Sequence, residues 1–213
     1  MSGYLGDVVA LARKDLRLET RTRETLPAMV LFVVAMLVVI HFALPAGAAD
    51  AAAYGLLWVA LVFTALLGLT RAWVPERTAG ALDGLVLATR DRSAIWLGKT
   101  LASLAFLLVA VAVAVPAFGI LFGPVGVSAL VGIVLAAFGI CAVGTLASAM
   151  AAATNGREIL LPLILLPLSI PLIAGGVGSG VSDDPTRYLG FLGLYDIVFA
   201  LLSWAAFEYV VTE

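Results

Sequence analysis

Six long apolar runs alternate with polar joints along the chain. A helix needs about 20 apolar residues to cross the ~30 Å hydrocarbon core of a bilayer, and each run reaches or approaches that length. Because lipid cannot hydrogen-bond to the backbone, each crossing is expected to be a helix that closes its own hydrogen bonds. The pattern therefore predicts an all-α integral membrane protein with six transmembrane helices. The predicted spans cover residues 26–44, 51–70, 95–122, 125–153, 159–177 and 188–211.

Composition agrees with this interpretation. The 213 residues are 63% hydrophobic and 12% charged, whereas soluble domains carry about 25% charged residues. A soluble protein is excluded. Six spans and their joints use nearly all of the chain, so residues 1–213 are predicted to form a single domain. Any catalytic engine is expected to be another chain, and we expect no nucleic acid partner.

The positions of the cations predict the orientation of the spans. Eleven of the twelve lysines and arginines precede the first span or lie in the second and fourth joints, and Arg187 is the exception. Short loops rich in Lys and Arg stay in the cytoplasm because these residues resist translocation. Both termini are therefore predicted to be cytoplasmic.

Residues 1–25 are charged but show helical periodicity. Leu5, Val8, Ala12 and Leu16 recur at helical spacing, and charged residues cover the remaining surface. This pattern predicts an amphipathic interfacial helix that lies in the plane of the membrane. The alternative is a short solvated extension of the first span.

The second joint is the longest cytoplasmic connection. Pro75 and Glu76 favour a helix start, and Ser93 is expected to cap the third span. After Gly80, a short amphipathic helix is predicted, because its apolar residues fall on one face. The apolar face of such an exposed helix must be buried against another protein, so we interpret the helix as a docking element for a soluble partner. The apolar residues are Leu82, Leu85 and Val86.

This joint resembles the E-x-x-x-G-(S/T/A)-L-(E/D)-x-L…K signature of ABC-2 type permeases. The match covers residues 76–85 and the lysine that opens the third span. In that superfamily the stretch is the coupling element, which docks into the nucleotide-binding subunit. The resemblance implies an ATPase-coupling role for Glu76, Gly80, Leu82, Asp83, Leu85 and Lys99.

Further stretches resemble the heme exporter permease subunit of bacterial cytochrome c maturation, the CcmB family. Residues 155–173 match its glycine and L-x-P-L-x-I-P segment, and residues 14–17, 194–197 and 207–211 also resemble it. The resemblance covers essentially the whole chain. It also suggests a second cytoplasmic contact at Asn155, Gly156, Arg157 and Glu158.

The resemblance implies a multi-pass subunit of the bacterial inner membrane that couples ATP hydrolysis by a partner to heme export or delivery. Implied partners are two copies of an ABC ATPase, a second copy of this chain, heme-handling membrane subunits and a periplasmic heme chaperone. ATP would be bound in the partner and heme would be a substrate, with no cofactor held firmly by this chain. An ABC-2 exporter of a drug, lipid or polysaccharide fits the same signature.

Gly98-Lys99-Thr100 ends like a Walker A loop. The first glycine of that motif would fall on Ser93, and an apolar span follows instead of a strand-to-helix turn. The motif therefore does not predict nucleotide binding. The alternative to a coupling role for Lys99 is a snorkelling lysine, whose ammonium group reaches the cytoplasmic headgroups.

Two ionisable residues inside spans are candidates for a substrate path. His41, the only histidine, lies near the outer end of the first span, and Asp196 lies in the sixth. An imidazole at that interface suggests a heme ligand, although an interfacial polar group is the simpler interpretation. Scattered ionisable groups do not form the constellation of a membrane-embedded enzyme.

Small residues and prolines predict how the spans pack. The fifth span is expected to kink at its prolines. The glycine-rich residues 175–180, with Ser182, Asp183, Asp184 and Pro185, are interpreted as a flexible outer joint. The fourth span has a mostly small i, i+4 row that would let another helix approach closely, either within the chain or at a dimer interface. The prolines are Pro162, Pro167 and Pro171, and the row is Gly132, Ala136, Ile140, Gly144, Ser148 and Ala152.

The distribution of cations generates a test of topology. Reporter fusions after Arg92 and after Asn155 should report the cytoplasm, because their joints hold most of the positive charge. Fusions after Gly47 and after Ser182 should report the outside. An outward Arg92 fusion would contradict the whole orientation.

Overall fold

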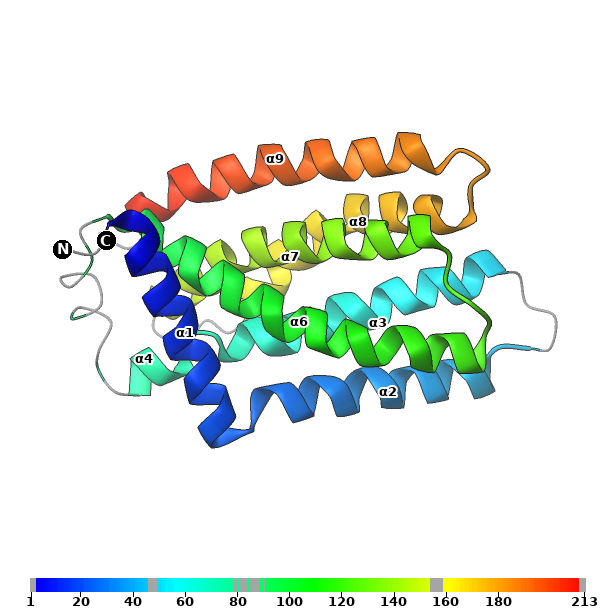
Figure 1. The fold of residues 1–213 in the computed structure, drawn as a ribbon, viewed down its shortest axis with the longest axis horizontal. Helices are drawn as coiled ribbons and strands as arrows, with labels where there is room; N and C mark the ends of the chain where they lie inside the picture. Colours follow the sequence, from blue (N-terminus) through cyan, green and yellow to red (C-terminus); the bar gives the residue numbers. More distant parts are fainter. Residues whose placement is uncertain are drawn as a thin grey trace.

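Six long helices run side by side along one axis, and a seventh crosses one end of them (Figure 1). The computed structural model describes residues 3–45, 50–78, 80, 84, 89, 91–153 and 159–210. The helices are α1 (Tyr4–Thr22), α2 (Thr25–Ala43), α3 (Asp50–Arg71), α4 (Val74–Thr78), α6 (Ser93–Leu121), α7 (Val127–Ala153), α8 (Leu160–Val181) and α9 (Pro185–Val210).

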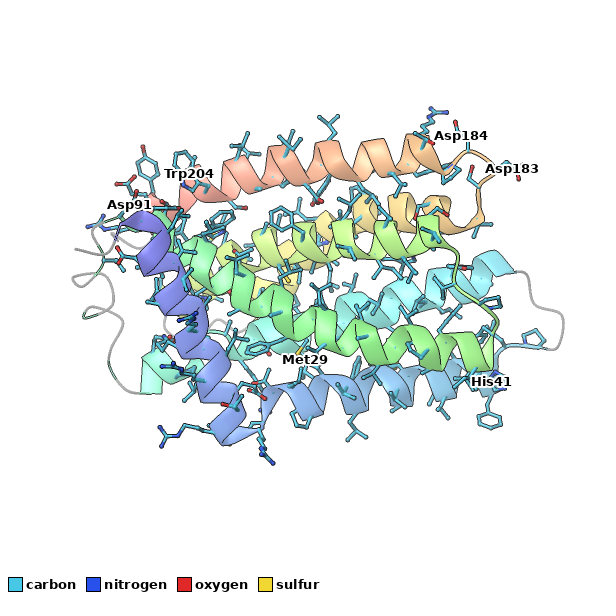
Figure 2. All side chains as sticks on the ribbon, viewed as in Figure 1. Met29, His41, Asp91, Asp183, Asp184 and Trp204 are labelled. Carbon is cyan, nitrogen blue, oxygen red and sulfur yellow. The ribbon has the colours of Figure 1, made fainter. Side chains whose placement is uncertain are left out.

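The described residues contain six helices that are long and apolar enough to cross a membrane. This confirms the predicted all-α class and the number of spans. The start of α1 and the end of α9 lie at the same end of the bundle, together with α4 (Figure 1). His41, Asp183 and Asp184 lie at the opposite end (Figure 2). The assignment of the first end to the cytoplasm stays a prediction from the positions of the cations.

The N-terminal helix does not extend the first span. It ends where Arg23 adopts a left-handed backbone conformation (φ 53°), with its N–H bonded to the carbonyl of Glu19. The chain then turns, and α1 folds back across the bundle and packs on α6. The carboxylate of Glu19 accepts a 2.7 Å hydrogen bond from the N–H of Leu26 in the first turn of α2. The extension interpretation of residues 1–25 is therefore wrong, whereas the interfacial location stays a prediction.

Helix α7 lies at the centre and packs against α3, α6, α8 and α9. Its small residues make this possible, because a Cβ added at Gly132 would meet Ser179 of α8. A Cβ added at Gly144 would likewise meet Leu69 of α3. Small residues at helix contacts let backbones approach closely in membranes. These glycines of the predicted row therefore serve contacts within the chain.

The predicted outer joint starts later than expected, because α8 continues to Val181 and residues 182–184 connect it to α9. Residues 175–180 are helical. Their glycines leave room for bulky neighbours: a Cβ at Gly176 would collide with the indole of Trp58, and one at Gly178 with the ring of Tyr188. Glycine here serves close packing between helices rather than flexibility.

Two local expectations also need correction. Pro162 is the third residue of α8, where a backbone N–H has no partner within the helix, so its ring demands no kink. Pro167 and Pro171 do lie inside the helix.

Ser93 is the first residue of α6 rather than its cap. Asp91 caps the helix start instead, because its Oδ1 accepts hydrogen bonds from the N–H (2.9 Å) and the hydroxyl (2.7 Å) of Ser93.

Close packing at Gly176 gives a stability prediction. Gly176→Ala should lower the stability of the purified protein by about 1–3 kcal/mol, because overpacking forces buried side chains to move. Gly119→Ala is the matched control, since nothing lies within 4 Å of a Cβ at that helical position. Thermal denaturation in detergent measures both variants. Equal midpoints for the two would contradict the packing shown for α8.

Candidate functional site

Four charged side chains from three helices meet where α1 crosses the end of the bundle. They are Lys14 and Asp15 of α1, Glu76 of α4 and Lys99 of α6, and we call them the Lys99 cluster. Lys99 is at its centre and only 1% exposed. Its ammonium lies 2.8 Å from Glu76 Oε1 and 3.0 Å from Asp15 Oδ2. The cluster thus joins three helices through compensating charges.

Lys14 completes the cluster from the solvent side. It donates a hydrogen bond to Glu76 Oε1, the oxygen that also accepts from Lys99, and its ammonium lies 3.1 Å from Asp15 Oδ1. Partial burial alone would lower the pKa of Lys14, but hydrogen bonding and charge attraction from Glu76 and Asp15 outweigh it and raise that pKa. Lys14 is therefore held in its charged form, and the cluster has two positive and two negative charges.

The end of α3 supplies a neutral partner. The helix stops at Arg71, and a two-residue turn leads into α4. Carbonyl groups at a helix C-terminus lack partners within the helix and favour nearby cations. The ammonium of Lys99 is such a cation, and it donates a 2.6 Å hydrogen bond to the carbonyl of Ala72 just after α3.

Trp73 attaches the same turn to α7 and α9. Its indole N–H donates a 3.0 Å hydrogen bond to the hydroxyl of Ser148 in α7, and its ring stacks on Phe207 of α9. The Lys99 ammonium lies 5.0 Å from the centre of the indole, within the range of a cation–π interaction. The start of the second joint is therefore attached to α1, α6, α7 and α9.

Burial makes the cluster depend on all of its members. Glu76 is 4% exposed, so removal of one partner would leave a charge both buried and uncompensated. Such losses typically cost about 3–5 kcal/mol. The second carboxylate oxygen of Glu76, Oε2, is buried without a hydrogen-bond partner among the described residues. The ion pairs therefore use only one of the two carboxylate oxygens of Glu76.

The structure revises two sequence interpretations here. The snorkelling interpretation of Lys99 is wrong, because its ammonium is enclosed by protein. Glu76, to which the resemblance gives an ATPase-coupling role, is not on an exposed surface but buried beside Lys99. Sequence reasoning missed Lys14 and Asp15 as members of the cluster. A signal was present for Asp15, which follows the buried Leu11 at helical spacing and so falls on the same face of α1.

The remaining coupling residues are only partly visible. Gly80 is exposed and has φ +61°, a conformation that glycine adopts without the strain other residues incur. The other predicted contacts lie outside the described residues: Leu82, Asp83, Leu85, Asn155, Gly156, Arg157 and Glu158.

The two candidates for a substrate path differ in environment. Asp196 of α9 is 5% exposed and faces α7, where a Cβ at Gly139 would collide with its carboxyl group. Neither carboxylate oxygen has a hydrogen-bond partner among the described residues. His41 is exposed at the far end of α2, with its ring 5.4 Å from that of Phe122. Within the described part of the chain no group of three or more His, Cys, Asp or Glu could hold a metal ion.

Comparison with known proteins gives consistent matches. The family model described as "CcmB protein" matches residues 7–211. A relative from Bradyrhizobium diazoefficiens, named "Heme exporter protein B", is 29% identical over 182 residues, which cover 80% of this chain and 79% of the relative. A protein of the same name from Paracoccus denitrificans is 27% identical over 207 residues, covering 93% of this chain and 94% of the relative.

The Lys99 cluster gives a prediction about stability. Lys99→Met should destabilise the protein by about 3–5 kcal/mol, because Glu76 and Asp15 would share Lys14 as their one remaining cation and one negative charge would stay uncompensated. Adding Glu76→Gln should recover part of that loss, which a double-mutant cycle on thermal midpoints measures. Arg71→Met is the control: Arg71 makes only a 3.8 Å ion pair with the exposed Glu24, and such pairs contribute about 0–1 kcal/mol. Additive effects of the two cluster substitutions would contradict their pairing.

Proposed function

This chain belongs to the CcmB family, and we propose that it is the permease subunit of an ABC transporter that serves heme export or delivery for cytochrome c biogenesis. Its six apolar helices suit a multi-pass protein of the bacterial inner membrane. The names of the two relatives support heme as the substrate. ATP hydrolysis is assigned to a partner subunit, so the chain itself is not an enzyme.

The Glu76–Lys99 ion pair is the observation that supports coupling most strongly. The two residues bracket the ABC-2 signature, 23 positions apart, and the fold brings their charged atoms to 2.8 Å. We propose that this pair tethers the signature segment to the bundle. Movement imposed on the segment would then be transmitted to α1 and α6, because separation would unpair buried charges.

This proposal changes the role given to Glu76. As a buried tether it acts inside the chain, and the contact with the ATPase is assigned to Leu82, Asp83 and Leu85. Gly80 lies between the tether and these residues in the sequence, and it has a left-handed conformation that glycine adopts without strain. Residues 155–158 are proposed as a second cytoplasmic contact, by resemblance alone.

The proposed assembly contains two ATPase subunits and a second copy of this chain. Heme-handling membrane subunits and a periplasmic heme chaperone complete it. His41 and Asp196 are the proposed residues of a substrate path: the exposed imidazole lies at the predicted outer end, and the buried carboxyl group lies within the bundle.

A double substitution tests the coupling proposal. Leu82→Asp/Leu85→Asp should abolish both co-purification of the ATPase and cytochrome c maturation, because two charges would be buried in the docking groove without partners. Loss of such anchors typically costs ~2 kcal/mol or more. The chain should remain in the membrane at normal abundance.

The matched control is Arg92→Asp, which changes net charge by the same amount in the same joint but lies outside the signature. It should leave recovery of the ATPase unchanged. Normal recovery with the double variant would contradict docking through this segment and transfer that role to residues 155–158.

A further inference from the structure

A second feature of α1 is a basic cleft on its side facing α4. The cleft has a volume of about 650 Å³, and its lining includes Arg13, Lys14, Arg17 and Arg21 beside Pro75 and Glu76. The single carboxylate in this lining is buried and already paired with both Lys14 and Lys99. The cleft therefore presents a concentrated positive charge with no compensating anion of its own.

Three arginines supply the uncompensated charge. Arg13, Arg17 and Arg21 recur every four residues, so they form one row along α1. All three are exposed, and none forms an ion pair within the described part of the chain. The guanidinium group is suited to phosphate because its planar donors match two phosphate oxygens at once.

An exposed apolar row lies next to the arginines. Leu5, Val9 and Leu16 are 72%, 47% and 37% exposed, whereas the face of α1 that contains Val8 and Leu11 is buried. With 3.6 residues per turn, this exposed row falls between the buried face and the arginines. A partner that covers both rows must offer negative charge and apolar groups side by side, as an anionic phospholipid does at its headgroup.

We propose that the cleft between α1 and α4 binds the phosphodiester headgroup of an anionic phospholipid. Arg13, Arg17 and Arg21 surround the phosphate, and the acyl chains lie against the exposed apolar row. The location supports this occupant, because α1 crosses an end of the spanning helices, where headgroups meet the protein (Figure 1). The proposal requires no assignment of the transported substrate.

The site also touches the Lys99 cluster, since Lys14 and Glu76 line the cleft. A bound phosphate adds an anion beside Lys14 and relieves the repulsion among the arginines, which recur at i, i+4 along α1. The thermal stability of the protein therefore depends on the lipid headgroup.

Lipid binding to the purified full chain in a neutral detergent tests the proposal. Phosphatidylglycerol should bind, as seen by native mass spectrometry, and should raise the thermal midpoint, whereas phosphatidylcholine should not. Arg17→Gln/Arg21→Gln should weaken phosphatidylglycerol binding by about thirtyfold, from the usual contribution of two cations near an anionic headgroup. Arg92→Gln/Arg187→Gln removes the same charge outside the cleft and should leave binding unchanged.

Three results would overturn the proposal. Equal loss in the control variant would show that binding follows net charge rather than the cleft. Equal stabilisation by glycerol 3-phosphate would identify a site for a soluble phosphate ester. Unchanged lipid binding in Arg17→Gln/Arg21→Gln, accompanied by loss of the ATPase from the membrane complex, would identify the arginines as a protein contact.

Discussion

A lysine buried at the end of an apolar bundle constrains everything around it. Lys99 is enclosed by protein, and an isolated ammonium in such a place would cost several kcal/mol, a large part of the stability of a domain. Two carboxylates, a carbonyl group and an indole ring surround it. These partners come from α1, α4 and the turn after α3, so Lys99 holds those three elements together.

The rest of the bundle is held by a different interaction. Lipid is as apolar as the side chains, so burial of apolar surface drives helices together less than it does in water, and close packing takes its place. Glycines supply that packing where α7 meets α3 and α8. Hydrogen bonds between helices add to it, as when the hydroxyl of Tyr195 in α9 donates to the carbonyl of Leu168 in α8 (2.7 Å).

The sequence predicts the spans well because the bilayer fixes their length and polarity. It predicts tertiary contacts poorly, since these depend on neighbours distant in the chain. Glycines 175–180 suggested a flexible joint because glycine weakens helices in water, yet here they accommodate Trp58 and Tyr188. Glu76 and Lys99 were identified through their signature, but their pairing was not, because the pattern does not reveal which charges the fold buries. Lys14 and Asp15 were missed for the same reason.

The stretch after α3 combines a firm attachment with a position that favours glycine. Trp73, Glu76 and the carbonyl of Ala72 fix this stretch to four helices, and Gly80 has a left-handed backbone conformation. The nearest fixed point of this segment is the buried Glu76–Lys99 ion pair, which is costly to separate. An ion pair on a solvated surface would contribute only about 0–1 kcal/mol and would hold the segment less firmly. Helix α1 lies against this fixed point and carries the basic cleft on its side facing α4, so the proposed lipid site and the signature segment share Lys14 and Glu76.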